Sequence, residues 1–181
     1  FKNYEIIIIH DNPKNKKELV LLKKLKNKYN KIIILCNKTN LGAGYSRNRG
    51  IKVAKGKFIA FLDSDDFWKK NKLSLQINYM KKNNFLVSHT SYDIINLKNI
   101  FVKKRLAYDL NYSDLKKSCD IGLSTVIISK KLLLSTSLFP KIKTKEDYVL
   151  WLSIAKKGLV FRSLKRSMTK WTNRPDSLSS S

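Results

Sequence analysis

Cysteine is scarce in this chain of 181 residues, which contains only Cys36 and Cys119. The two lie far apart in the sequence and show no spacing typical of metal ligands. A disulfide framework and a zinc site are therefore both unsupported, because each needs cysteines in pairs or clusters. This usage favours a reducing compartment, and we expect a cytoplasmic protein.

A long apolar run is also absent. No stretch approaches the roughly 18 to 20 apolar residues that a membrane-spanning helix needs, and the N-terminal residues do not form the h-region of a secretory signal. No internal repeat or low-complexity linker divides the sequence. A chain of 181 residues is long enough to bury a real core. We therefore expect one domain, residues 1–181, that is soluble or peripheral to a membrane.

Acidic residues are few, since 13 Asp and Glu stand against 38 Lys and Arg and give a formal net charge of +25. Such a charge favours anionic partners, namely nucleotides, nucleic acid or acidic lipid. The lysines are scattered through every segment together with Asn and Ile, so a general compositional bias explains them as well. Aromatic residues interspersed with lysine are typical of nucleic-acid-binding modules. That alternative has no recognisable motif behind it, and we expect no nucleic-acid partner.

Three of the scarce acids gather in one place. The apolar run at residues 57–62 stops at Asp63, and Asp65 and Asp66 follow at once. Carboxylates this close repel one another unless a cation shares them or water solvates them. In open α/β sheets, ligands bind beyond the carboxyl ends of the strands. The cluster predicts a divalent metal site, although Asp-Ser-Asp is also ordinary turn chemistry and that interpretation stays open.

The N-terminal half alternates strands and helices. Apolar runs predict strands, and helical spacing predicts helices, in the order strand 5–10, helix 15–29, strand 31–36, a helix ending at Ala54, and strand 57–62. Parallel neighbours need crossover connections, which such helices supply. The predicted fold class is α/β, a Rossmann-like, doubly wound, mainly parallel sheet flanked by helices.

The C-terminal half is less regular. Its predicted elements are helix 71–82, strand 85–95, a short helix 113–118, strand 124–128, helix 145–157 closed by Gly158, and two short strands near Leu159 and Met168. The rest of residues 96–123 shows no clear periodicity. We expect that region to contribute to the acceptor side of a site.

Three segments, in this order and spacing, resemble the family 2 glycosyltransferases: residues 40–51 (NLGAGYSRNRGI), 56–68 (GKFIAFLDSDDFW) and 146–152 (EDYVLWL). The resemblance covers nearly the whole chain and implies the GT-A fold. The ending at residues 171–179 (WTNRPDSLS) is similar to the tail of bacterial members that build teichuronic acid, capsule and O-antigen polysaccharides. The implied reaction moves a sugar, with inversion, from a nucleotide donor to a lipid-linked or polysaccharide acceptor. The expected donor is a UDP-sugar.

In this family, aspartates at the position of the acidic cluster hold Mn²⁺ or Mg²⁺ against the donor diphosphate. The resemblance places the metal on Asp65 and Asp66, and places Asp63 and Asp65 against the donor. The physical argument agrees, because a hard cation with oxygen ligands offsets the charge that builds on a leaving diphosphate.

The resemblance also assigns roles to residues outside the cluster. Asp147 matches the general base that takes the proton from the acceptor hydroxyl. Such a base needs a raised pKa, and either partial burial beside Trp151 or the neighbouring acid Glu146 would supply it. Both acids open a helix, where stabilisation by the helix dipole explains them equally well. Asp11 matches the residue that recognises the nucleotide base. Arg47 is expected to grip phosphate oxygens, although a solvated surface position is an alternative.

Family members begin with a further strand and helix before the segment equivalent to Phe1, so the resemblance implies an N-terminally truncated domain. That strand is central in the family, and if these residues are all that the cell makes, we expect poor folding, weak donor binding and little or no turnover. A donor-binding remnant without catalysis is therefore the alternative to an active enzyme. The basic side chains also predict peripheral contact with the anionic inner face of the plasma membrane.

Overall fold

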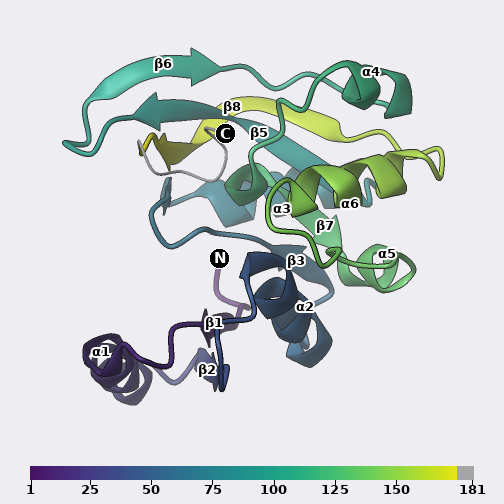
Figure 1. Cartoon of the computed structure of the whole chain (residues 1–181). Helices are drawn as coiled ribbons and strands as arrows, with labels where there is room; N and C mark the ends of the chain where they lie inside the picture. The colour runs from purple at the N-terminus through teal and green to yellow at the C-terminus, as the bar shows by residue number, and fades with distance from the viewer. Residues whose placement is uncertain (175–181) are drawn as a thin grey trace.

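The computed structural model describes residues 1–174 and contains two separate sheets (Figure 1). The smaller sheet pairs β1 (Ile6–His10) with β2 (Ile32–Cys36) in parallel, in a register that runs from Ile6 opposite Ile32 to His10 opposite Cys36. Helix α1 (Lys16–Lys28) makes the crossover between them. The strand–helix–strand order predicted from the sequence is confirmed here.

The larger sheet has the strand order β3-β7-β5-β8-β4, with β6 also pairing with β5. Its strands are β3 (Phe58–Ala60), β4 (Phe67–Trp68), β5 (Val87–Ile95), β6 (Phe101–Arg105), β7 (Ile127–Ser129) and β8 (Arg162–Thr172). The long central strands β5 and β8 run parallel, whereas the other pairs in this sheet are antiparallel. The α/β class is confirmed, but strand direction is more mixed than the alternation of elements predicts. The difference arises because β5–β6 is a hairpin and because β7 pairs antiparallel with both of its neighbours, β3 and β5.

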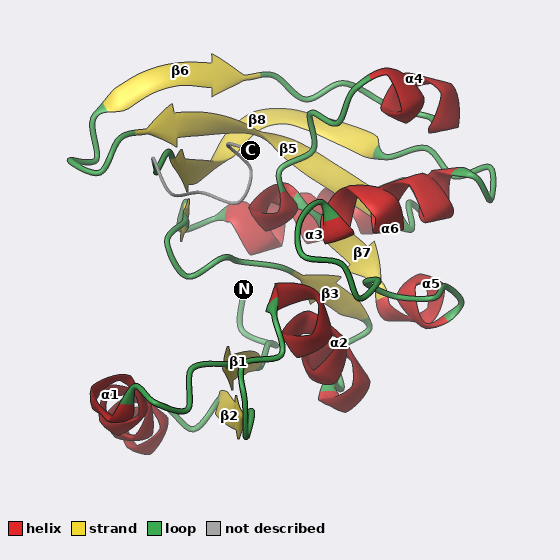
Figure 2. Cartoon of the chain, viewed as in Figure 1, coloured by secondary structure: helices red, strands yellow, loops and turns green. Residues whose placement is uncertain are grey.

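Helices pack around the larger sheet and beside the smaller one (Figure 2). The remaining helical segments are α2 (Ala43–Val53), α3 (Lys72–Lys82), α4 (Tyr112–Lys117), the 3₁₀ turn η1 (Leu123–Thr125), α5 (Lys130–Leu134) and α6 (Glu146–Ala155). Within residues 1–174, no helix has the length and apolar character needed to cross a bilayer. The left-handed glycine predicted after α6 is confirmed, since Gly158 has φ +84°.

Strand β8 differs most from the sequence prediction. The two short strands expected near Leu159 and Met168 are one strand of 11 residues. Exposed Lys165 and Arg166 interrupt its apolar alternation, and its pairing with β5 shifts register on either side of Ser91. Because of this interruption, the sequence pattern does not predict one continuous strand. Pairing with β5 nevertheless keeps the strand continuous.

The main core centres on Trp151 of α6, which has no solvent exposure. Its ring lies 5.4 Å from Phe161 and 6.3 Å from both Phe61 and Phe139, measured between centroids. Phe61 follows β3, so this cluster joins α6 to the strand that leads into the acidic residues. The indole nitrogen has no hydrogen-bond partner within the described residues.

These contacts predict different costs for two substitutions of Trp151. Trp151→Ala opens a large cavity and is expected to lower the free energy of unfolding by about 4 kcal/mol. Trp151→Phe keeps most of the ring contacts and removes an unpaired donor, so a loss of about 1.5 kcal/mol or less is expected. Urea denaturation followed by circular dichroism measures both. Equal losses for the two variants would contradict the stabilising role assigned to the ring contacts.

Candidate functional site

Asp63, Asp65 and Asp66 form a tight turn after β3. The Asp66 amide donates to the Asp63 carbonyl at 3.1 Å, and the Asp63 amide donates to the Ser124 hydroxyl at 3.0 Å. The interpretation of this segment as a turn is therefore correct as far as its backbone goes. The turn does not exclude chemistry, because it leaves the Asp63 and Asp65 carboxylates partly exposed.

Asp66 is the buried member of the acidic turn, with 7% exposure. Burial raises the pKa of its carboxyl to about 6, and the neighbouring charges of Asp63 and Asp65 add to the rise. Hydrogen bonds from Ser124 and from the Thr172 amide, the latter at 3.0 Å, act in the opposite direction. A crowded, poorly solvated carboxylate of this kind gains from a nearby cation.

Asp65 lies at the more open side of the turn. Its carboxylate pairs with the Arg174 guanidinium at 3.1 Å, and its carbonyl accepts a hydrogen bond from the Thr172 hydroxyl. The end of β8 thus holds both Asp65 and Asp66. No sequence pattern indicates this contact, because Thr172 lies 106 residues from Asp66.

Arg47 of α2 bridges two acidic segments that are far apart in sequence. One guanidinium nitrogen lies 2.8 Å from Asp63 and the other lies 2.5 Å from Glu146. Burial alone would lower the Arg47 pKa, but the charges and hydrogen bonds of Asp63 and Glu146 outweigh it and the pKa is raised. The alternative of a solvated surface position is thereby wrong for Arg47, whose side chain is 18% exposed.

Asp147 is held beside this ion pair at the start of α6. Its carboxylate accepts a hydrogen bond from the Tyr148 amide at 2.8 Å, so it does serve the helix terminus. Burial, together with the charges of Glu146 and Asp63, nevertheless raises its pKa, with Tyr148 and Arg47 acting against the rise. A carboxyl with a raised pKa is better suited to accept a proton near neutral pH than an ordinary aspartate.

Asp11 lies after β1 and has no direct contact with the acidic turn. Its two carboxylate oxygens accept hydrogen bonds from the Leu41 and Gly42 amides, each at 2.8 Å, and from the buried Asn37 side chain at 2.6 Å. Asn37 also donates to Ser46, the neighbour of Arg47. Helix α2 therefore links Asp11 to the rest of the site, and a ligand at Asp11 would share an already bonded carboxylate.

A buried polar network behind the acidic turn was not predicted from the sequence. Lys72 and Gln76 of α3 have no exposure, and Lys72 donates to Gln76 at 2.8 Å. Gln76 donates to the Thr125 carbonyl at 3.0 Å, and Trp68 donates to the Ser124 carbonyl at 2.7 Å. Burial lowers the Lys72 pKa to about 7. These contacts hold the segment whose Ser124 hydroxyl binds the turn.

The carboxylates of the acidic turn are suited to a metal ion that a bound ligand also coordinates, and less suited to a metal ion coordinated by protein side chains alone. Across residues 1–174, no three His, Cys, Asp or Glu side chains are arranged as a metal cage. Asp65 and Asp66 supply two carboxylates, and Mg²⁺ commonly binds one or two carboxylates with substrate phosphates and water completing its shell. The residues present therefore fit a metal that arrives with a diphosphate.

Residues 1–142 match the sequence model of a protein family described as Glycosyl transferase family 2. The chain belongs to this family. Among relatives of this family 2 chain is WfgD of Escherichia coli, named UDP-Glc:alpha-D-GlcNAc-diphosphoundecaprenol beta-1,3-glucosyltransferase. It is 40% identical over 156 residues, which cover 86% of this chain and 60% of WfgD. WfaP of the same species, with the same activity in its name, is 38% identical over 168 residues, covering 90% and 63% of the two chains.

The family 2 chain thus spans about three-fifths of the length of these relatives. Its structure is similar to that of Staphylococcus aureus TarS 1–349 in complex with UDP-GlcNAc, with a TM-score of 0.76 and 22% identity, over 98% of this chain and 52% of that one. This likeness establishes the GT-A fold expected from the sequence. Of the tail segment 171–179, residues 175–179 lie outside the described residues.

The two ion pairs of Arg47 predict that its substitution destabilises the protein more than substitution of a surface arginine. Arg47→Met leaves the buried Glu146 and the partly exposed Asp63 without their cation, and is expected to lower the free energy of unfolding by about 3 kcal/mol. The matched control is Arg162→Met, because Arg162 pairs with Asp109 at 2.8 Å but both side chains are at least 40% exposed. The control should lose about 1 kcal/mol or less. Urea titration compares them, and similar losses would contradict a structural role for the bridge.

Proposed function

We propose that this chain is the donor-binding and catalytic region of an inverting, metal-dependent glycosyltransferase. The observation that carries the proposal is the Arg47 bridge, which joins the acidic turn at Asp63 to Glu146 and so brings Asp147 beside the turn. A group that holds a leaving diphosphate and a base that activates an acceptor must lie close together for a direct displacement.

The proposed roles follow the chemistry of each side chain. Asp147 takes the proton from the acceptor hydroxyl as that oxygen attacks the anomeric carbon, and Glu146 supports its raised pKa. Asp63 and Asp65 lie against the donor, and Asp11 recognises its base. Asp65 and Asp66 would hold Mn²⁺ or Mg²⁺, which supplies Lewis-acid stabilisation of the leaving diphosphate. Arg47 positions the two acidic segments and adds positive charge near the phosphates.

The substrate classes are proposed from the relatives. WfgD and WfaP are named for transfer from a UDP-sugar to a diphosphoundecaprenol-linked sugar, and TarS was solved with UDP-GlcNAc. We infer a UDP-sugar donor and a lipid-linked or polysaccharide acceptor, used in cell-surface polysaccharide synthesis. The protein would act in the cytoplasm, at the inner face of the plasma membrane, where its net charge of +25 favours contact with anionic lipid.

Calorimetric titration with UDP, with and without Mn²⁺, tests the donor site. Binding should be at least tenfold tighter with Mn²⁺, and the double variant Asp65→Asn with Asp66→Asn should lose this dependence because the carboxylates that share the cation are gone. Asp114→Asn with Asp120→Asn is the matched control, since Asp120 is exposed, Asp114 is partly exposed, and their partners are Arg105 and Asn111 rather than groups of the turn. Metal-independent binding by the unaltered protein would sink the metal assignment.

Asp147→Asn separates catalysis from donor binding. The variant keeps the shape of the side chain but cannot accept a proton, so turnover should fall by about 10²-fold or more while the affinity for UDP changes little. In the unaltered protein, turnover should fall on acidification at a pH above the usual range of Asp, because the Asp147 pKa is raised. Asp114→Asn again serves as control, because Asp114 also lies in a first helical turn. Donor binding without any turnover in the unaltered protein would instead identify a binding remnant.

A further inference from the structure

The turn between β5 and β6 carries an unusual concentration of exposed apolar side chains. Leu97 is 64% exposed, Ile100 57%, Phe101 59% and Val102 52%. Single exposed apolar residues are normal on protein surfaces, but four of them so close together mark an interaction surface. Both faces of β6 are exposed along its whole length, and β6 lies beside β5 at the margin of the sheet (Figure 1).

The turn is internally bonded. The Asn96 amide donates to the Ile100 carbonyl at 3.0 Å, and the Asn99 amide donates to the Asn96 carbonyl at 2.9 Å. The Asn96 side chain also accepts from the Lys98 and Ile100 amides, each at 3.0 Å. Entry of this turn into a less polar environment would therefore leave few backbone groups without a partner, which removes the main cost of burying a loop there.

The charges of the turn and of β6 are all basic, and the nearest acid of the sheet, Asp93 of β5, lies opposite Lys104 and pairs with Lys69. Lys98, Lys103 and Lys104 are exposed beside the apolar residues, and residues 94–108 contain no Asp or Glu. Lysine on an edge strand also discourages pairing with another sheet, and that role accounts for the lysines alone. It does not account for the apolar side chains between them. We define the hairpin patch as Leu97, Lys98, Ile100, Phe101, Val102, Lys103 and Lys104.

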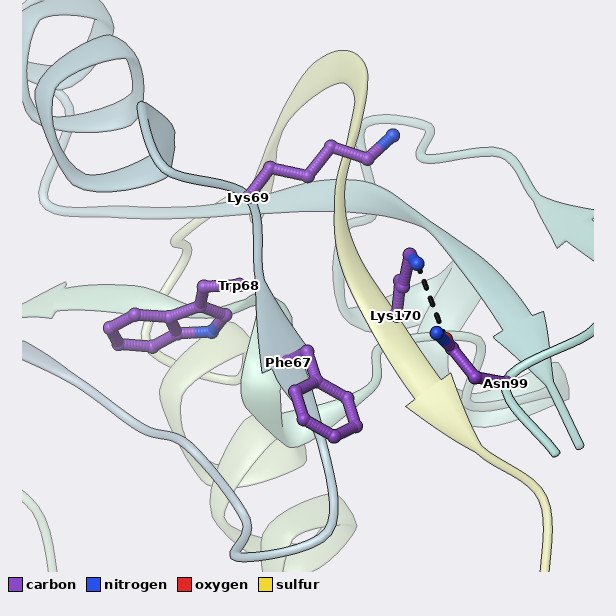
Figure 3. A pocket seen from close by; sticks show the side chains of 5 residues that line it. All are labelled: Phe67, Trp68, Lys69, Asn99 and Lys170. Carbon is purple, nitrogen blue, oxygen red and sulfur yellow. Dashed lines mark hydrogen bonds between the residues drawn. The ribbon is translucent and has the colours of Figure 1, made fainter. Parts of the chain in front are cut away.

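The hairpin patch adjoins the acidic turn through β8 and β4. The Asn173 amide donates to the Ile95 carbonyl at 2.8 Å, and Thr172 beside it binds Asp66. A hollow of about 270 Å³ lies between β4 and the hairpin, where Lys170 contacts Asn99 and Phe67 is 58% exposed (Figure 3). Phe67 directly follows Asp66, so apolar and basic groups continue from the hairpin to the edge of the candidate site.

We infer that the hairpin patch docks on an anionic lipid bilayer, with its apolar side chains entering the acyl boundary and its lysines meeting headgroup phosphates. The combination of exposed apolar and basic side chains fits this partner, because a bilayer surface offers an apolar layer beneath a negative one. The functional meaning of this docking rests on the proposed function. It places the acidic turn near the membrane, from which a lipid-linked acceptor would come.

Cosedimentation of the full chain with vesicles tests the surface. One set of vesicles contains phosphatidylcholine alone and the other adds phosphatidylglycerol at about 30%. The unaltered protein should bind the anionic vesicles, and the variant Leu97→Ser, Ile100→Ser, Phe101→Ser should bind at least tenfold more weakly. The matched control is Val20→Ser, Leu21→Ser, Leu134→Ser, which removes three side chains that are 53%, 57% and 51% exposed elsewhere on the protein.

A second pair of variants separates the patch from the overall charge. Lys98→Gln, Lys103→Gln, Lys104→Gln should weaken binding more than Lys23→Gln, Lys24→Gln, Lys26→Gln on α1, although both remove three exposed charges. Equal losses from the two lysine sets, or equal losses from the two serine sets, would overturn the inference and leave only non-specific attraction. A dimer in sedimentation equilibrium that the hairpin serine variant abolishes would also overturn it, by identifying a second copy as the occupant.

The titration with UDP distinguishes failure of the docking surface from failure of the proposed function. A protein that binds UDP with Mn²⁺ but ignores anionic vesicles would refute the docking surface alone. Vesicle binding through the hairpin without any UDP binding would refute the proposed donor site and leave the surface in place.

Discussion

The partly buried guanidinium of Arg47 makes the ion pairs on which the candidate site depends. It reaches Asp63, 16 residues away along the chain, and Glu146, 99 residues away. Two carboxylates drawn together in this way would repel each other without the cation between them. Because Arg47 also stacks over Phe139 at 5.5 Å, the aromatic core and the ion pair hold the guanidinium from two sides. The separation between the acidic turn and Asp147 is therefore fixed by the Arg47 ion pairs together with the packing of Phe61 against Trp151.

Behind this contact, polar groups from distant segments fix the turn itself. Ser124 binds the Asp63 amide, Thr172 binds Asp66, and Gln76 secures the carbonyl of Thr125 next to Ser124. Each of these contacts is at least partly buried, so their loss would leave groups without water as a substitute partner. The site is consequently built on the junction of η1, α3 and β8 as much as on the acidic residues.

The sequence predicted those parts of the molecule whose pattern is local. Strands β1 and β2 are runs of isoleucine, and the acidic turn is visible because acids are otherwise rare in the chain. Strand β6 was missed because all its side chains are exposed and show no alternation, and β4 because it has two residues. Ser124, Thr172 and Lys72 were missed for a different reason. Their importance comes from partners far away in sequence, and a single sequence does not record which segments meet.

The smaller sheet is the softer part of the molecule. Helix α1 buries none of its side chains, and in the paired strands only His10 and Ile32 are buried. Two strands with so little cover open at a lower free energy than a core such as that around Trp151. Asp11 lies at the end of this soft sheet, whereas Asp66 is anchored to the rigid one. A ligand that contacts both Asp11 and Asp66 would have to order β1 and β2 as it binds. The entropic cost of ordering that sheet would lower its measured affinity. The conformational order of residues that do not contact the ligand would then contribute to its affinity.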